Sequence, residues 1–315
     1  MDAFLTNLKD WLAAYGKVSF LILAMAAGAL VPQASRLSFL IQYMLMGMLF
    51  LSFLGVRFNP RAVGGGVLKV LAANLLIGFG SYLLLARADH ELAMSAFITA
   101  IAPTAISSTV LVSLIQGKVD FMTGAVLLTN VVVALVVPLA IPLVVGRSVQ
   151  VSTLDVLLPV LITMFVPLIL ARLAMYLPEK PLAGLMRARK LSFFFWLTNL
   201  FIISAKASDF IRNTNDGSVA MLLKIILMAL VICVMNFVIG AWLGGKEFHR
   251  EASQALGQKN NSFAIWVALT FMNPLIAMGP TIYIVYHHLY NTWQIYQFEK
   301  KNRENPADGF LNDPA

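Results

Sequence analysis

The sequence predicts an all-α integral membrane protein, and three observations lead to this prediction. Hydrophobic residues make up 59% of the 315-residue chain and charged residues 12%. The mean hydropathy is +0.81. Long uncharged runs recur, one of them from residue 260 to residue 298. Because a membrane-spanning helix needs roughly 20 mostly apolar residues, this length allows about ten spans joined by short loops.

The basic residues are interpreted as topology signals. The net charge of +8 does not indicate nucleic-acid binding, because Lys and Arg are scattered singly or in pairs between apolar runs. If the N-terminus is cytoplasmic, most of these residues fall in cytoplasmic loops. Of the basic residues, the loops on the opposite side of the membrane contain only Arg36, Arg87, Arg147, Lys206, Arg212 and Lys224. Both termini are therefore expected in the cytoplasm. The single cysteine, Cys233, leaves no internal disulfide or cysteine metal cluster.

The first half of the chain is expected to contain five spans, at residues 17–31, 37–56, 70–86, 92–117 and 121–146. The fourth carries Pro103 and a cluster of hydroxyl side chains, residues 103–109, at its middle. Proline removes a helix hydrogen bond, and hydroxyls can satisfy loosened backbone. We interpret this as a broken helix, with a proline kink packed by Ser and Thr as the alternative.

The second half is expected to contain spans at residues 156–171, 191–205 and 224–244, a ninth from His249 and a tenth after Pro274. Residues 178–190 form the longest polar connection, and residues 206–216 are expected to be a loop. Residues 299–315 are expected to be a cytoplasmic tail.

The ninth span contains the polar stretch 256–262, with Gln258, Lys259, Asn260 and Asn261, inside apolar sequence. Irregular polar backbone at membrane depth is tolerated only where a helix breaks and lines a cavity. We therefore predict a second broken helix. The alternative is an extramembrane loop between two complete spans, although residues 251–259 are too few to leave the membrane and return.

The two halves of the chain share a short sequence match. The run that begins at Asn74 and ends at Gly78 matches the run from Asn236 to Gly240, and each precedes a broken span. With five spans per half, residues 1–147 and 148–298 would form inverted repeats whose broken helices meet near the midplane. Both breaks are expected to be non-helical and close together, with Asn74 and Asn236 bonding to the loosened backbone. Gly240 and Gly244 are expected to give a face for close helix packing.

At these residues the chain resembles the bile acid:sodium symporter family. The resemblance covers nearly all ten spans and is specific at the proline break followed by Gly117, at Asn74, at residues 260–262 and at the aromatic and histidine segment of the tenth helix. It implies a panel domain and a core domain in a cell inner membrane, with helices four and nine crossing in the core. It also implies sodium beside the crossover and an organic anion in the cleft between domains.

The chain departs from the family at the sodium positions. Of the hydroxyl side chains that bind sodium in the family, the one at Ser108 is retained, whereas the other two are replaced by Met122 and Val126. The family's side-chain amide next to Ser108 is replaced by Thr109. The glutamate that the family has in its ninth helix aligns with Leu256 or a position near it, so that acid is missing from this chain. If sodium is bound, the resemblance places it near Ser108, Asn74 and Gln258.

Lys259 stands where the family provides a backbone carbonyl ligand. An ammonium among Asn74, Ser108, Gln258 and Asn260 could hold the crossover by hydrogen bonds as an ion would. Burial disfavours the charged form of lysine, so a proton-coupled cycle is a further option. The alternative is that Lys259 extends to the cytoplasmic side and touches nothing at the site.

A carboxylate is the expected substrate group, because the second halves of both broken helices begin with N–H groups and partial positive charge. The substrate-binding candidates are Thr104, Ser107, Ser108, Thr109, Asn261, His287 and His288. Adjacent helix residues point in different directions, so at most one histidine is expected in the cleft. Both could equally be packed or interfacial.

The predicted function is secondary active transport of a small organic anion by alternating access, without enzymatic activity or a cofactor. Sodium coupling is expected to be weakened or replaced by Lys259, giving a sodium-independent or proton-coupled transporter. The alternatives are an ordinary sodium-coupled symporter, a channel and an intramembrane enzyme, for which no span offers a metal cluster or a base near Ser107. The lipid bilayer and the anion are the expected partners, and a monomer is one option for the oligomeric state.

Overall fold

The computed structural model describes residues 19–54, 56, 62–146, 152–213 and 219–304. Within these ranges the chain is helical, and the one β-type pairing is an isolated bridge between Thr104 and Lys259. Six helices in this part are long and apolar enough to cross a membrane, over Pro32–Phe53, Gly65–Leu85, Val119–Val145, Thr153–Ala174, Glu179–Asn213 and Val219–Gly244. The predicted class, an all-α multi-pass membrane protein, is confirmed at this level.

The first half begins with an apolar helix over Ser19–Leu30. It continues with η1 (Pro32–Phe39), α2 (Leu40–Phe53), α3 (Gly65–Leu85), α4 (His90–Ile101), α5 (Ser108–Leu114) and α6 (Val119–Val145). The Asp89 side chain caps α4 by accepting from the Leu92 N–H at 3.1 Å. Pro32 occupies the first position of η1, where its missing N–H removes no helical bond.

The second half contains α7 (Thr153–Ala174), α8 (Glu179–Ala188), α9 (Leu191–Asn213), α10 (Val219–Gly244), α11 (His249–Gly257), α12 (Asn261–Phe271) and α13 (Pro274–Glu304). A capping box formed by Ser152 and Asp155 begins α7. The Asn260 side chain begins α12 by accepting from the Phe263 N–H at 3.3 Å.

Two boundary predictions are wrong. The polar connection at residues 178–190, for which no helix was predicted, contains α8, and Pro181 lies in the first turn of that helix, where proline is tolerated. Residues 206–213 continue α9, which is tied to the first helix by a hydrogen bond of 2.8 Å from the Ser208 hydroxyl to the Ala29 carbonyl. The tail begins later than expected, since α13 extends to Glu304. The rest of that tail lies outside the described residues.

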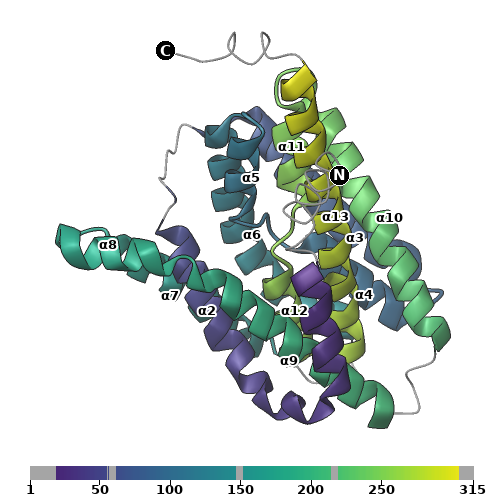
Figure 1. Cartoon of the computed structure of the whole chain (residues 1–315). Helices are drawn as coiled ribbons and strands as arrows, with labels where there is room; N and C mark the ends of the chain where they lie inside the picture. The colour runs from purple at the N-terminus through teal and green to yellow at the C-terminus, as the bar shows by residue number, and fades with distance from the viewer. Residues whose placement is uncertain (1–18, 55, 57–61, 147–151, 214–218, 305–315) are drawn as a thin grey trace, which may run out of the picture.

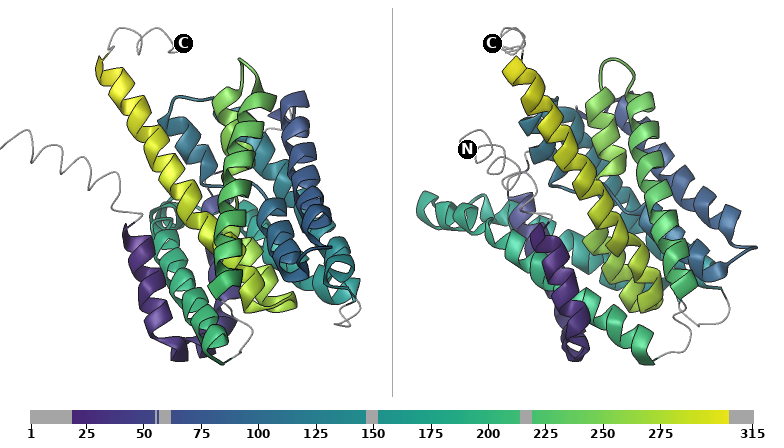
Figure 2. Two further views of the ribbon diagram at one scale, coloured as in Figure 1. Left: turned by 90° about the vertical axis from the view of Figure 1, so that its right-hand side faces the viewer. Right: turned by 45° about the vertical axis from the view of Figure 1, so that its right-hand side comes forward.

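The helices pack in two groups (Figures 1 and 2). The α2 group comprises the first helix, η1, α2, α7, α8 and α9. Its members pack closely, since a Cβ at Gly28 would lie 2.1 Å from the Phe201 carbonyl oxygen. The crossover group comprises α3, α4, α5, α6, α10, α11, α12 and α13. The two groups meet where α7 faces α6, where α9 faces α13 and where α2 faces α12.

The predicted small-residue face of α10 is confirmed. A Cβ at Gly240 would lie 2.5 Å from the Ala252 carbonyl oxygen, and one at Gly244 would lie 2.9 Å from the Ala252 Cβ. Because both contacts involve atoms held by the backbone of α11, neither can relax cheaply. The glycines therefore set how closely α10 approaches α11, and α11 leads directly to the second break.

We expect Gly240→Ala to lower the free energy of unfolding by about 1–3 kcal/mol, because the added methyl would force α10 and α11 apart. Gly80→Ala is the matched control: it adds the same group in α3, where no atom lies within 4 Å of the new Cβ. That variant should be neutral or more stable by about 0.5–1 kcal/mol. Thermal unfolding of purified protein in detergent measures both, and equal midpoints would contradict the packing argument.

Candidate functional site

The first interruption lies between α4 and α5, at residues 102–107. Pro103 ends α4, since proline has no N–H to donate and disfavours helical backbone in the residue before it. Ala102 accordingly adopts φ −46° and ψ 138°, outside the helical region. The chain resumes as α5 at Ser108.

The second interruption lies between α11 and α12, at residues 258–260. Gln258 is extended, with φ −89° and ψ 96°, and α12 begins at Asn261. As predicted, residues in both stretches are non-helical. The breaks are shorter than predicted, however, because Ser108, Thr109, Asn261 and Ser262 already belong to the helices that follow.

The two interruptions pair with each other as a short antiparallel bridge. The Ala105 N–H donates to the Gln258 carbonyl at 2.8 Å, and the Asn260 N–H donates to the Pro103 carbonyl at 2.7 Å. Thr104 and Lys259 face each other at the centre of the bridge. The predicted proximity of the two stretches is therefore confirmed, and we call this paired region the crossover.

Helix α6 forms hydrogen bonds to the first interruption of the crossover. The Thr104 N–H donates to the Thr129 hydroxyl at 3.1 Å, and the Asn130 side-chain amide donates to the Thr104 carbonyl at 2.9 Å. The Thr104 hydroxyl donates across the crossover to the Ala255 carbonyl at 2.6 Å. These bonds satisfy the backbone of Thr104 on both sides. Sequence reasoning did not find Thr129 and Asn130, although an amide within an apolar span was a usable signal.

The two repeated asparagines flank the crossover, as predicted. The Asn74 side-chain amide donates to the Ile101 carbonyl at the end of α4, at 3.0 Å. Asn236 reaches the backbone indirectly: its amide donates to the Tyr283 hydroxyl at 3.2 Å, which donates to the Gly257 carbonyl at 2.6 Å. The predicted direct bond of Asn236 to backbone is thus replaced by a relay through Tyr283.

Lys259 points into the protein. Its side chain is 2% exposed, and its ammonium Nζ donates to the Asn74 carbonyl oxygen Oδ1. Extension to the surface is therefore excluded. The other residues of the expected cation set make different bonds: the Ser108 hydroxyl donates to Ala105, Gln258 donates to the Ser107 hydroxyl, and Asn260 caps α12.

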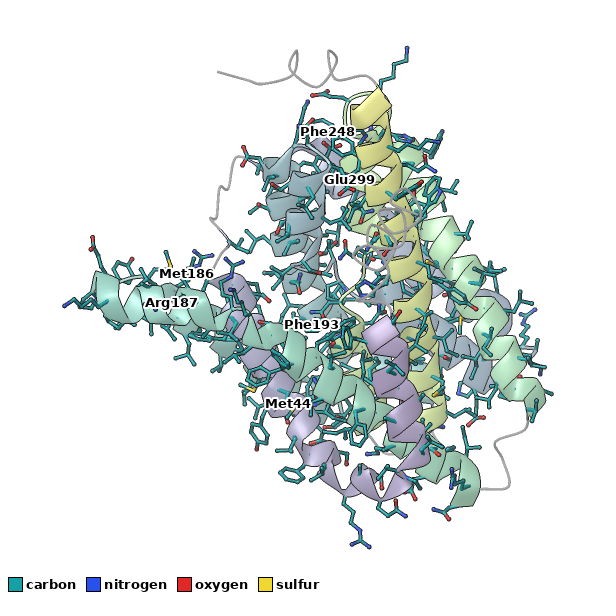
Figure 3. All side chains as sticks on the ribbon, in the orientation of Figure 1. Met44, Met186, Arg187, Phe193, Phe248 and Glu299 are labelled. Carbon is teal, nitrogen blue, oxygen red and sulfur yellow. The ribbon has the colours of Figure 1, made fainter. Side chains whose placement is uncertain are left out.

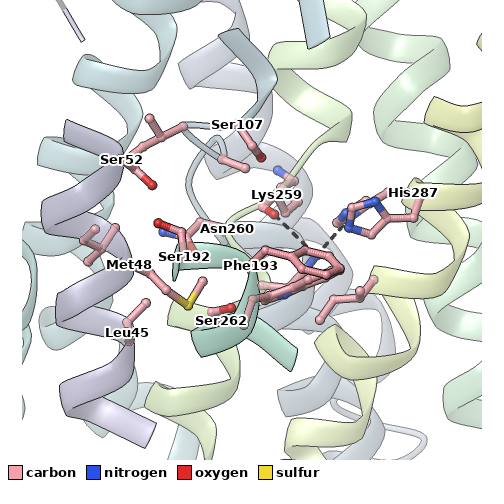
Figure 4. A pocket seen from close by; sticks show the side chains of 17 residues that line it. Leu45, Met48, Ser52, Ser107, Ser192, Phe193, Lys259, Asn260, Ser262 and His287 are labelled. Atoms are coloured by element: carbon pink, nitrogen blue, oxygen red, sulfur yellow. Dashed lines mark hydrogen bonds between the residues drawn. The ribbon is translucent and has the colours of Figure 1, made fainter. Parts of the chain in front are cut away.

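A cavity of about 340 Å³ lies beside the crossover, between it and the α2 group (Figure 4). One wall is polar and includes Ser107, Asn260, Asn261 and Ser262. The opposite wall comes from α2 and α9, and α13 closes the side. The full lining is Leu45, Met48, Leu49, Ser52, Ala105, Ile106, Ser107, Ser192, Phe193, Trp196, Lys259, Asn260, Asn261, Ser262, Ile284, His287 and His288. None of these described lining residues is Asp or Glu.

Four of the substrate-binding candidates line the cavity, namely Ser107, Asn261, His287 and His288. The hydroxyls of Thr104, Ser108 and Thr109 do not reach it, because they donate to the carbonyls of Ala255, Ala105 and Ile106. Ser108 and Thr109 bond locally, to carbonyls three residues earlier, whereas Thr104 bonds across the crossover, and sequence position alone reveals neither arrangement.

Both histidines line the cavity, so the expectation of at most one is wrong. His287 is buried, and its Nδ1 accepts from the Asn261 amide at 3.1 Å. The His288 ring packs on Trp196, with 5.0 Å between centroids. Neighbouring side chains on a helix differ in direction, and the cavity wraps around that edge of α13 far enough to meet both.

The wall from α2 and α9 was missed by sequence reasoning. Met48 and Ser52 come from α2, and Ser192, Phe193 and Trp196 come from the first turns of α9. In an apolar span such residues have the same pattern whether they face lipid, another helix or a cavity. Their role becomes visible only when the helices are packed.

A scan against protein-family models gives no match to this chain, and a search of curated proteins gives none either. Among the described residues, no group of three or more His, Cys, Asp or Glu side chains could hold a metal ion.

Tyr283→Phe is expected to reduce the free energy of unfolding by about 1–3 kcal/mol, because the buried Gly257 carbonyl and the Asn236 amide would lose a partner. Tyr286→Phe is the matched control on the same helix, since its hydroxyl makes a long bond of 3.4 Å at an exposed position. It should change stability by no more than about 0.5 kcal/mol. Denaturation followed by tryptophan fluorescence compares the two, and similar losses in both variants would refute the relay.

Proposed function

We propose that this protein is a secondary active transporter of a small organic anion, in which Lys259 replaces a coupling cation. One observation carries the proposal: a buried ammonium belongs to a pair of interrupted helices that forms one wall of a 340 Å³ cavity. Discontinuous helices that meet around a cavity are the usual setting of substrate and ion sites in secondary transporters.

The order of elements supports an inverted repeat of ten spans. Each half has a span, a second span preceded by a short helix, a third with the buried asparagine, an interrupted fourth and a long fifth. The antiparallel pairing of the interruptions is what a two-fold relation between residues 1–147 and 148–298 would produce. On this proposal the α2 group is the panel domain, the crossover group is the core domain, and both termini lie on the cytoplasmic side of the inner membrane.

Alternating access requires two rigid bodies and a boundary that can slide. Several interhelical hydrogen bonds lie within one group, such as Gln42 to Thr163 at 2.9 Å in the α2 group and Asn74 to Ile101 at 3.0 Å in the crossover group. At the cavity the boundary is formed by rings such as Trp196 against His288. Contacts of this kind can be exchanged without leaving backbone groups unpaired.

The polar wall offers donors for a carboxylate. Helix α12 begins at the cavity, and Asn261 and Ser262 occupy its first turn, where N–H groups have no partner within the helix. Partial positive charge at this end favours an anion. The hydroxyls of Ser107, Ser192 and Ser262 add further donors. The aromatic and aliphatic side chains of the other wall would contact the rest of the substrate.

Replacing a cation with Lys259 follows from its position. The ammonium donates to Asn74, which binds the last carbonyl of α4, and Lys259 follows the end of α11 by two residues. Such helix ends carry partial negative charge. A cation there offsets this charge without an ion from solution. The resemblance to the bile acid:sodium symporter family supplies the comparison, since that family binds sodium beside its crossover.

Asn261→Ala is expected to abolish saturable uptake into proteoliposomes while leaving the unfolding temperature within a few degrees of the wild type. The substitution removes the amide that orients His287 and faces the cavity. Gln42→Ala is the control, because it removes a half-buried amide that bonds to Thr163 away from the cavity. Unchanged uptake by the Asn261 variant would place the substrate site elsewhere.

Wild-type uptake, and stabilisation by carboxylates in a thermal-shift screen, should be the same in sodium and in choline, because Lys259 already occupies the cation position. Lys259→Met, which replaces lysine with an unbranched, uncharged side chain one atom shorter, should reduce uptake by about tenfold or more through loss of a charged hydrogen bond worth roughly 1.5–3 kcal/mol. Lys246→Met is the exposed control. A strict sodium requirement in the wild type would restore the ordinary symporter mechanism, and stimulation by a pH gradient would identify proton coupling.

A further inference from the structure

Helix α8 and the residues beside it form an unusual corner of the molecule. In Figures 1 and 3, α8 projects beyond the helices at the left of the view. Leu185 and Ala188 pack against the hydrophobic core and α8 adjoins α2, while most of its other side chains are exposed. The helix is too short and too polar to span a membrane, so its exposed face needs another explanation.

The exposed face of α8 is basic. Lys180, Arg187 and Lys190 are exposed, Arg189 is half-buried, and Glu179 is the acid within the helix. In the described part of the chain none of these four cations forms a salt bridge, whereas Lys118 pairs with Glu247 at 3.0 Å and Lys224 with Asp89 at 2.9 Å. The protein therefore concentrates positive charge here without supplying the counter-charge.

Exposed apolar side chains accompany these cations. Tyr176 is 87% exposed, and Met175, Leu177 and Met186 are also exposed. Helix α7 has 22 residues and ends at Ala174, so it is about 33 Å long, which is enough to cross a hydrocarbon core of about 30 Å. Tyr176 and α8 therefore follow directly where the chain leaves the hydrocarbon. Tyrosine is enriched at that depth in membrane proteins.

Helix α8 is connected directly to α9, which contributes to the cavity wall. Helix α9 begins at Leu191, one residue after Lys190, and Ser192, Phe193 and Trp196 in its first two turns line the cavity. Figure 3 shows Arg187 and Phe193 along this continuous run of helix. Anything that holds α8 in place also restrains the side chains at the start of α9.

We infer that α8 and its flanking residues bind the headgroups of anionic phospholipids at the bilayer surface and thereby position the α9 wall of the cavity. The phosphate oxygens of the lipid accept from Lys180, Arg187 and Lys190, while Tyr176 and Met186 contact the adjoining acyl chains. Basic amphipathic helices beside a span bind anionic bilayers through this combination of charge and apolar contact. The binding does not depend on the transport activity proposed above.

The test uses the full-length protein in detergent, titrated with phosphatidylglycerol or phosphatidylcholine. Native mass spectrometry counts retained lipids, and thermal unfolding reports stabilisation. Each cation near an anionic surface contributes about fivefold in affinity, so Lys180→Gln/Arg187→Gln/Lys190→Gln should weaken phosphatidylglycerol binding by on the order of a hundredfold. The control Arg36→Gln/Arg87→Gln/Lys246→Gln removes the same charge from exposed positions elsewhere and should bind as the wild type does.

The charge-preserving variant Lys180→Arg/Arg187→Lys/Lys190→Arg should also bind as the wild type does. If the triple glutamine variant does not fold, Arg187→Gln alone should show a loss of about fivefold. Equal retention of the two lipids by the wild type would overturn the inference, as would undiminished phosphatidylglycerol binding by a folded glutamine variant. Equal stabilisation by inorganic phosphate or by an acidic peptide would overturn it too, because the surface would then select a soluble anion or a protein.

Discussion

The structure depends on the pairing of two short interrupted stretches of backbone at its centre. A helix that stops inside a membrane leaves N–H and C=O groups unpaired, and each costs free energy in lipid. Here the groups at residues 103, 105, 258 and 260 satisfy one another, and α6 satisfies those of Thr104. The cost of interrupting α4–α5 is thus offset only because α11–α12 is interrupted at the same place. Each interruption therefore requires the other.

This pairing determines the electrostatics around it. Two helices end at the crossover, bringing carbonyls and partial negative charge, and two begin there, bringing N–H groups and partial positive charge. Asn74 and Tyr283 bind the carbonyls of Ile101 and Gly257, and the Lys259 ammonium donates to Asn74. The first residues of α12, Asn261 and Ser262, line the cavity. On the proposed function, one arrangement of backbone would serve both the fixed cation and, next to it, the anion-binding wall.

Sequence reasoning located the crossover because polar residues inside apolar runs are conspicuous: Pro103, Lys259 and the paired asparagines Asn74 and Asn236 all stand out. It failed where the signal depends on packing. Phe193 and Trp196 look like any other apolar residues of a span, and the Thr104 hydroxyl is taken up by the Ala255 carbonyl rather than the cavity. Helix α8 was missed because its charges resemble those of a loop, although its apolar residues recur at helical spacing.

A cation built into the chain changes what can drive the proposed transport cycle. When an ion from solution completes a crossover, its binding energy can shift the balance between conformations, because the ion binds one of them better. Lys259 is present in every conformation and contributes no such difference while its charge is constant. The substrate alone would then shift the balance, which gives facilitated movement or exchange. Uphill transport would require Lys259 to change protonation between conformations; its ammonium contacts the neutral Asn74, and within the described part of the chain it forms no salt bridge with a carboxylate.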